Sequence, residues 1–307
     1  MLSRPPRQAD TSSVNVGLLG SGEMGQAVGK TLRANGVTVR TCLDGRSART
    51  RGLAAAAGIE DVAKLADLVT ASDVFLSIVP PAEAKTLACE VASAIRSTGA
   101  RPVYVDCNAV APSTVREVAE IVGGDIVDVG IIGAPPRPGS GTRLYASGRS
   151  ARRLSLPGLD VRVLDDQVGT ASALKMCYAA LTKGSTALAM ELLVAAKKLG
   201  LFETLEREIA DSQPEQRAVM ERALPRAPTV AHRWIGEMEE IAKTFADLGL
   251  TPRMLEGAAD MYRFAAASPL ATERPESRDV RRTMRDTIEE LAEHLASEVA
   301  GPLDPRD

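Results

Sequence analysis

The stretch "VNVGLLGSGEMGQAVGKTL", Val14 to Leu32, decides the fold of the first half of the chain. It reads as a buried strand, a G-x-G-x-x-G turn and a helix. The first glycine permits a tight turn, the second lets the backbone approach a pyrophosphate, and the third lets helix and strand pack closely. This context predicts a dinucleotide site, with a purely structural glycine turn as the alternative. The expected cofactor-binding residues of the turn are Gly20, Ser21, Gly22, Glu23, Met24 and Gly25.

Further β-branched runs alternate with helical patterns after this turn. The runs are "VTVRTCL", "DVFLSIV", "PVYVDC" and "DIVDVGII", and "GTRLYASG" and "VRVLDD" add two short strands. Such alternation indicates βαβ units and a parallel sheet covered on both faces. The sequence therefore predicts an α/β Rossmann-type, doubly wound N-terminal domain.

The second half of the chain shows only helical periodicity, which predicts an all-α C-terminal domain entered by a long interdomain helix. We expect helices over residues 169–198, 213–223, 229–248, 252–267 and 277–299. The expected organisation is a disordered tail of residues 1–12, a dinucleotide-binding domain of residues 13–166, a helical substrate and dimerisation domain of residues 167–300, and a tail of residues 301–307.

Composition excludes several classes of function. A net charge of -3 and an aromatic content of 3% give no reason to expect a nucleic-acid surface. No uninterrupted apolar run approaches the length of a membrane span, and the N-terminal stretch lacks the apolar core of a signal peptide. Four cysteines without C-x-x-C spacing predict reduced, buried thiols in a cytoplasmic protein, and with only two histidines no metal site is expected.

The end of the second predicted strand, "TCLDGRSART", is expected to supply the residues that bind the adenosine ribose of the cofactor. Asp44 stands near the spacing of a ribose-binding acid, whereas Arg46 and Ser47 suit a 2'-phosphate. The positive local balance favours NADP over NAD. The alternative is that the arginines only cap and solvate the next helix.

The stretch "ALKMCYAALTKG" places Lys175 in a long helical pattern of apolar and small residues. Part of its environment should therefore be dry, and burial in apolar surroundings lowers the pKa of a lysine toward the range useful for proton transfer. The structural alternative is a lysine that extends to solvent or pairs with an acid. Lys183 is expected to be a solvated or interface residue.

The sequence resembles the β-hydroxyacid dehydrogenases, the group that includes 3-hydroxyisobutyrate and 6-phosphogluconate dehydrogenases. "GLLGSGEMG" matches the opening motif of the family, and "DGRS" lies where NADP-using members carry Asn-Arg-Ser or Asn-Arg-Thr. "DVFLSIVP" and "VDCNAVAPSTV" resemble the segments that line the cofactor, which implicates Val79, Pro80 and Asn108. The motif "HRWIGEMEEIA" is similar to a bacterial branch with a distinctive helical domain.

The same resemblance implies a role for Lys175. The catalytic helix of the family reads Gly-x-x-x-x-x-Lys-x-x-x-Asn, and Gly169 and Lys175 occupy the matching places. Such a lysine accepts the hydroxyl proton in alcohol oxidation and donates it in reduction. Tyr178 could hold or protonate a substrate oxygen, or could instead be a core tyrosine. Ala179 and Thr182 stand where a phosphogluconate enzyme needs asparagine and glutamate, which argues against oxidative decarboxylation of 6-phosphogluconate.

The substrate loop "DVGIIGAPPRPGSGTRLYASG" departs from the family pattern, which holds a substrate carboxylate with a serine and glycines. Ile132 takes the place of the serine, and Arg137 could anchor an anionic group instead or be a solvated loop residue. Trp234 could line the pocket or belong to a core or interface. The expected substrate-binding residues are Asp128, Ile132, Gly133, Arg137 and Trp234.

The sequence thus predicts an NADP-dependent oxidoreductase that transfers hydride between nicotinamide and a small hydroxy or carbonyl compound. Two alternatives stay open: an imine reductase, and a catalytically silent NADP-binding sensor or partner protein. The resemblance further implies a homodimer in which the long helix packs across the partner, with the active site between the domains.

Overall fold

A computed structural model describes residues 14–20, 22–274 and 277–299 of the chain. It divides the chain into two compact units, one of Met1–Val79, Glu83–Asn108 and Pro112–Ser172, the other of Pro80–Ala82, Ala109–Ala111 and Ala173–Asp307. The division after Ser172 lies a few residues beyond the expected boundary at 166–167. The two expected tails, and Ser21, lie outside the described residues.

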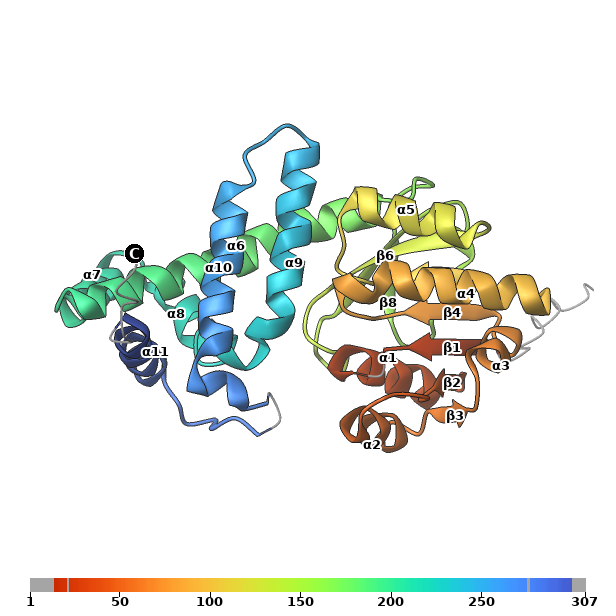
Figure 1. Ribbon diagram of the computed structural model, residues 1–307, viewed down its shortest axis with the longest axis horizontal. Helices are drawn as coiled ribbons and strands as arrows, with labels where there is room; N and C mark the ends of the chain where they lie inside the picture. Colours follow the sequence, from red (N-terminus) through yellow and green to blue (C-terminus); the bar gives the residue numbers. More distant parts are fainter. Residues whose placement is uncertain (1–13, 21, 275–276, 300–307) are drawn as a thin grey trace, which may run out of the picture. The chain divides into compact units, whose positions relative to one another are not determined.

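The first unit is built on one sheet of eight strands in the order β3-β2-β1-β4-β5-β6-β7-β8. The strands are β1 (Asn15–Leu19), β2 (Thr38–Cys42), β3 (Glu60–Val62), β4 (Val74–Ser77), β5 (Val103–Asp106), β6 (Ile126–Ile132), β7 (Arg143–Ser147) and β8 (Asp160–Val163). In Figure 1, β4, β1, β2 and β3 lie side by side in that order.

All neighbouring strands of the sheet run parallel except β6 and β7, which are antiparallel. The strand order reverses between β1 and β4, and this is the point at which open α/β sheets bind ligands, at the carboxyl ends of their strands. The predicted Rossmann-type fold is confirmed. The short strand β3 was not predicted, because its residues, "EDV", are mostly polar and exposed.

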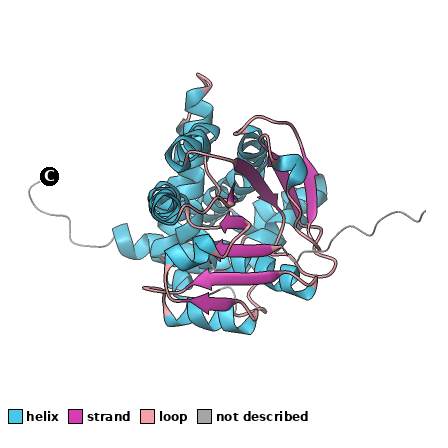
Figure 2. Cartoon of the chain, turned by 90° about the vertical axis from the view of Figure 1, so that its right-hand side faces the viewer, coloured by secondary structure: helices cyan, strands magenta, loops and turns pink. Residues whose placement is uncertain are grey.

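Helices cover both faces of the sheet, as Figure 2 shows in cyan beside the magenta strands. They are α1 (Glu23–Ala34), α2 (Ala48–Ala56), α3 (Leu65–Thr70), α4 (Ala84–Thr98) and α5 (Pro112–Val122), with short 3-10 turns η1 (Pro81–Glu83) and η2 (Ala151–Arg153). Successive strand residues point to opposite faces. Phe75 and Tyr104 therefore join one buried cluster, and Leu76 and Val105 join the other.

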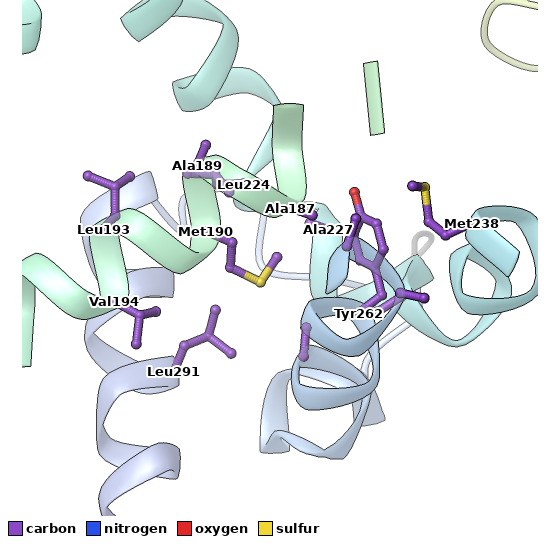
Figure 3. Packing of buried hydrophobic residues seen from close by; sticks show 14 of the residues in the cluster. Ala187, Ala189, Met190, Leu193, Val194, Leu224, Ala227, Met238, Tyr262 and Leu291 are labelled. Carbon is purple, nitrogen blue, oxygen red and sulfur yellow. The ribbon is translucent and has the colours of Figure 1, made fainter. Parts of the chain in front are cut away.

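The second unit consists of helices joined by turns and loops, with no strand in its described part after Ala173. It contains α6 (Thr170–Lys198, which begins in the first unit), α7 (Phe202–Ser212), α8 (Pro214–Ala223), α9 (Ala227–Asp247), α10 (Arg253–Ala267), η3 (Pro269–Thr272) and α11 (Met284–Val299). One cluster of buried side chains joins these helices. Figure 3 shows part of it, with Met190 and Val194 of α6 near Leu291 of α11.

Two helices differ from the sequence-based expectation. Helix α7 was not predicted, although Phe202, Leu205 and Ile209 repeat at helical spacing along it, and Phe202 is fully buried. Helix α11 begins at Met284 rather than at 277, because the preceding charged segment "ESRDVRRT" has no apolar periodicity.

Helix α6 is long and apolar enough, by length and composition alone, to cross a membrane. This is weak evidence, because a core helix of a soluble protein has the same length and composition, and 44% of the most apolar stretch of α6 is buried in the protein. Lys175, Lys183 and Glu191 interrupt its apolar sequence. Its exposed apolar side chains, Leu174, Tyr178, Leu181 and Leu188, follow one another at intervals of four, three and seven residues.

The cysteines are all free, but only two of them are buried as predicted. Cys42 and Cys107 lie in the sheet core, with 8% and 3% exposure. Cys89 and Cys177 are exposed, which corrects the prediction for these two. Each lies on the exposed side of its helix. The residue type alone does not indicate which side of a helix a cysteine occupies.

Candidate active site

The glycine turn after β1 has the geometry expected of a dinucleotide-binding turn. Gly20 has a φ of +101°, and a Cβ on it would lie 1.9 Å from the carbonyl oxygen of Ile78. Gly25 faces the turn so closely that a Cβ would lie 2.1 Å from the carbonyl oxygen of Gly20. Both positions therefore require glycine on structural grounds.

Gly22, unlike Gly20 and Gly25, has no neighbouring atom that requires a glycine, and it therefore bears on whether a cofactor fits this turn. It is the N-cap of α1, with a φ of -71° that any residue can adopt, and no atom lies within 4 Å of a Cβ placed there. As a glycine, it offers no side chain of its own to the N–H groups of this helix end. A glycine with no internal packing reason, at the N-terminus of a helix, fits a backbone that a diphosphate approaches.

Of the other predicted residues in the turn, Glu23 lies in the first turn of α1, and Met24 packs against the sheet core. Both residues lie in the first turn of the helix. They were predicted to be cofactor-binding residues, and their contact with a cofactor stays a prediction.

Asn108 joins the carboxyl ends of β4 and β5. Its side-chain oxygen accepts a hydrogen bond from the N–H of Val79 at 2.7 Å, and its amide nitrogen donates to Ser77 Oγ at 3.0 Å and to Asp106 Oδ2 at 2.9 Å. Asn108 is only 2% exposed. Its amide is thus engaged within the protein and holds the backbone of Val79 in place. Contact of Val79, Pro80 and Asn108 with a cofactor stays a prediction.

The residues expected near the ribose lie after β2. Ser47 is the N-cap of α2, and its hydroxyl accepts a hydrogen bond from Thr50 N–H at 3.2 Å. Arg46 forms an exposed ion pair with Glu83, with 3.4 Å between Nη1 and Oε2, and Asp44 is exposed. Ser47 thus caps α2, and the guanidinium of Arg46 is partly exposed. Binding of a 2'-phosphate by these two residues stays a prediction.

Asp128 is not placed to bind substrate, which corrects the sequence prediction. It has 0% exposure. Its Oδ2 accepts hydrogen bonds from the N–H groups of Gly169 and Ser172, both at 2.9 Å, and its Oδ1 accepts one from Ser172 Oγ at 2.7 Å. Ser147, its register partner on β7, accepts from Ala171 N–H at 3.0 Å. The two side chains cap the first turn of α6.

Burial raises the pKa of Asp128 above its ordinary value, and the hydrogen bonds from Ser172, Gly169 and Ser147 oppose that rise. The carboxyl group therefore holds the start of the helix that carries Lys175. The family position was recognised correctly, but sequence alone did not show that the carboxylate points inward.

The other substrate-loop residues are divided between core and surface. Ile132 is buried with 5% exposure at the end of β6, so its predicted role as a direct substrate contact is corrected to a packing role. Gly133 is exposed, with a φ of +123°. Arg137 is also exposed, in a turn where its N–H donates to Ser140 Oγ at 3.1 Å.

Lys175 lies on α6 and is partly buried. Its charge lowers the pKa of Glu237, a carboxylate of α9 that is distant in sequence. Burial raises the pKa of Glu237, but the positive charges of Lys183, Lys175 and Arg233 outweigh burial and hold it below the usual value. The lysine is thus not in a purely apolar environment, and no local pattern around Lys175 indicates this acid.

Lys183 forms an ion pair with Glu237, and their side chains are 16% and 19% exposed. The amine also lies 5.5 Å from the centre of the Trp234 ring, and Tyr262 Oη donates to the carbonyl oxygen of Lys183 at 2.7 Å. Trp234 packs edge-on against Tyr262 with ring centres 5.2 Å apart. Of the two expectations for Lys183, the solvated residue is therefore wrong, and the interface residue stays a prediction.

The residues that follow Lys175 on α6 face different ways. Tyr178 is 45% exposed, so the alternative of a core tyrosine is wrong. Ala179, where the family has asparagine, is 6% exposed and packs in the helical core. Thr182 donates its hydroxyl to the carbonyl oxygen of Tyr178 at 3.2 Å.

The motif "HRWIGEMEEIA" of α9 contains several residues with contacts to distant parts of the chain. Glu240 accepts a hydrogen bond from Ala111 N–H at 2.7 Å, and a Cβ on Gly236 would lie 4.0 Å from Pro81. Residues 80–82 and 109–111, which follow β4 and β5, belong to this unit. Glu240 and Gly236 of α9 thus lie against Ala111 and Pro81, whereas Glu237 pairs with Lys183 of α6.

Two family models match the chain. One, described as the NAD binding domain of 6-phosphogluconate dehydrogenase, matches residues 15–156. The other, described as a domain of unknown function (DUF1932), matches residues 196–265. The second match includes the α9 motif that the sequence had singled out.

Solved structures agree with these matches. The chain is 32% identical to a conserved protein of unknown function with structural similarity to 3-hydroxyacid dehydrogenases, over 82% of this chain and 98% of that chain, with a TM-score of 0.61. It is 20% identical to Mycobacterium tuberculosis 3-hydroxyisobutyrate dehydrogenase, over 91% of this chain and 99% of that chain, with a TM-score of 0.65. It is 21% identical to an imine reductase from Myxococcus stipitatus, over 92% of this chain and 99% of that chain, with a TM-score of 0.52.

The last two similarities are distant and concern the fold, whereas the first is close enough to assign membership. The glycine turn, the sheet order and the helical unit all agree with that assignment. The chain belongs to the family of NAD(P)-dependent oxidoreductases that includes 6-phosphogluconate dehydrogenase-like and 3-hydroxyacid dehydrogenase-like proteins.

Proposed function

We propose that the protein is an NADP-dependent oxidoreductase that interconverts a small carbonyl compound and the corresponding alcohol, with Lys175 as proton donor and acceptor. The observation that carries the proposal is the position of Lys175, partly buried on the capped helix α6 and electrostatically coupled to Glu237. Asp128 and Ser147 fix the start of that helix. A fixed, partly dry amine is the group that proton transfer to a substrate oxygen needs.

When bound, the nicotinamide cofactor supplies or accepts hydride. In reduction, the ammonium group of Lys175 donates a proton to the carbonyl oxygen as hydride reaches the carbonyl carbon. In oxidation, the neutral amine accepts the hydroxyl proton. Gly22 leaves the backbone open to the diphosphate, and the Asn108 network keeps the Val79 turn in place.

Preference for NADP rests on Arg46, whose guanidinium is partly exposed after β2. Arginine binds phosphate oxygens in a bidentate manner, so it suits the 2'-phosphate that distinguishes NADP from NAD. The ion pair with Glu83 is long and solvent-exposed, and a phosphate could replace Glu83 as its partner at little cost.

A homodimer is part of the proposal. Leu181 and Leu188 of α6 are 68% and 61% exposed, and with Leu174 they form a seven-residue repeat typical of a helix that packs against another. Two exposed free cysteines fit a reducing compartment, so we place the enzyme in the cytoplasm.

Imine reduction is the second candidate. The observation that favours it is Ala179, which removes the asparagine with which the family orients a hydroxyl or carbonyl substrate. A panel of hydroxy acids, ketones and imines, followed at nicotinamide absorbance with wild type and Lys175→Ala, separates the candidates. If no compound of any class is converted while NADP binds, the protein is a silent nucleotide-binding protein instead.

A further inference from the structure

Arg143, the first residue of β7, lies at the ligand-binding edge of the sheet in the first unit. Because β7 runs antiparallel to β6, Arg143 is the register partner of Ile132, the last residue of β6. The parallel strands β1, β4, β5 and β6 end at this edge, and open α/β sheets bind their ligands at the carboxyl ends of such strands. The change of direction at β7 therefore brings Arg143 to the same edge as the glycine turn and Asn108.

The loop that joins β6 to β7 is closed at its base. Thr142 Oγ1 donates a hydrogen bond to the carbonyl oxygen of Ala134 at 2.6 Å and lies 2.8 Å from Ser140 Oγ. A Cβ on Gly133 would lie only 3.0 Å from Thr142 Cα, so the two ends of the loop pack against each other. The backbone at Arg143 is therefore fixed by the strand pairing on one side and by the closed loop on the other.

The side chain of Arg143 carries a donor that the described protein does not satisfy. Its Nε is buried and has no hydrogen-bond partner among residues 14–20, 22–274 and 277–299, whereas the residue as a whole is partly exposed. The guanidinium stays charged and has no acceptor atom of its own. A buried N–H group without an acceptor is unfavourable. An oxyanion that binds side-on to Nε and one Nη would satisfy this donor.

The nearest carboxylate on the neighbouring strand is held by another arginine. Asp160 is the register partner of Arg143 on β8. Arg162 Nε lies 3.2 Å from both carboxylate oxygens of Asp160, and Arg162 Nη2 donates to Oδ2 at 2.8 Å. These hydrogen bonds, with the charges of Arg162 and Arg143, hold the pKa of Asp160 below its usual value. Two arginines thus share one carboxylate, and the net charge of these three residues is positive.

We propose that Arg143 binds an anionic group of the substrate, a carboxylate or a phosphate, so that the protein acts on small carbonyl or hydroxy compounds that carry such a group away from the reacting carbon. The Nε–H and one Nη–H group donate to two oxygens of the anion. The inference rests on the proposed oxidoreductase function and narrows it to a substrate class.

Anion binding is measurable without turnover. In proton–nitrogen NMR spectra of wild type, with and without NADP, the Nε–H signal of Arg143 is assigned through the carbon atoms of its own side chain. It should shift on titration with succinate or with inorganic phosphate, and the acid that shifts it identifies the group. The Nε–H of Arg162, which already donates to Asp160, is the internal control and should stay in place. No shift of the Arg143 signal with either acid, or an equal shift of both signals, overturns the proposal.

Turnover tests the same residue from the side of the substrate. Each neutral aldehyde is paired with an anionic one, butanal with succinate semialdehyde and glyceraldehyde with glyceraldehyde 3-phosphate. Arg143→Leu should lower kcat/KM for the preferred anionic compound by about 10- to 100-fold, mainly through KM, and leave its neutral counterpart near wild type. Arg143→Lys keeps the charge but not the two-point geometry, and it should recover part of the loss. An equal loss for both members of a pair overturns the proposal.

Arg149→Ala is the matched control, because Arg149 is exposed just beyond the other end of β7. It should leave the preference for the anionic compound unchanged. Arg137→Ala tests the arginine of the loop, and loss of the preference in this variant but not in Arg143→Leu overturns the proposal. If no compound is converted, the proposed function fails, and the NMR titration still decides whether Arg143 binds an anion. The titration also decides if Arg143→Leu does not fold, because it uses wild type.

Discussion

Replacing Asp128 with alanine should destabilise the start of α6. The substitution removes the acceptor for the N–H groups of Gly169 and Ser172 and for the hydroxyl of Ser172, at a position with 0% exposure. A buried donor left without a partner costs about 1 to 3 kcal/mol. Two backbone donors therefore give a loss of about 2 to 6 kcal/mol, reduced by the relief of a buried charge. Asp128→Asn keeps one acceptor oxygen and should lose less than half of that amount.

Thermal unfolding followed by circular dichroism, with hydrogen exchange of the first turn of α6, measures this loss. Because burial raises the folded-state pKa of Asp128 above its unfolded value, protonation of this group favours the fold. Its contribution is fully present below the ordinary aspartate pKa and is lost as pH rises through the folded value. Asp128→Asn should therefore gain on wild type as pH rises through that window. A variant with unchanged stability but weakened substrate binding would refute the capping role.

Further predictions concern the cofactor turn and the oligomer. Gly22→Ala should keep the fold but weaken NADP binding by about tenfold or more in fluorescence titration, because the new Cβ occupies space open to the diphosphate. Gly25→Ala should instead lower the melting temperature, because its Cβ would clash with the carbonyl oxygen of Gly20; equal stability of the two variants would contradict this. Arg46→Ala should reduce the ratio of NADP to NAD affinity by about tenfold, and an unchanged ratio would assign the preference elsewhere. Leu181→Asp should convert a dimer to a species near 32.4 kDa in light scattering, and a wild type that is already monomeric would reject the interface.

The sheet of the first unit was predictable from sequence because its central strands β1, β4, β5 and β6 are buried on both faces, and because a glycine turn of known geometry follows β1. The strand β3 and the helix α7 were missed for different reasons. "EDV" carries no apolar periodicity. In α7, Phe202, Leu205 and Ile209 supply only about one apolar residue per turn, among charged side chains.

The candidate site was predictable in position but not in orientation. The sequence placed Asp128 and Asn108 at family positions, and the structure shows that both side chains serve internal hydrogen bonds. The pairing of Lys183 with Glu237 spans 54 residues and joins two helices. No local pattern encodes such a contact, because it depends on which faces of α6 and α9 meet.

The central claim is that Lys175 transfers the proton, and one comparison tests it most directly. Turnover of the best substrate of the panel is measured for wild type, Lys175→Ala and Lys198→Ala, which removes an exposed lysine from the same helix, together with NADP affinity. We predict that Lys175→Ala lowers kcat by about 100- to 10,000-fold with NADP affinity retained, and that Lys198→Ala is unchanged. A Lys175→Ala enzyme that reduces the substrate as fast as wild type would contradict the account.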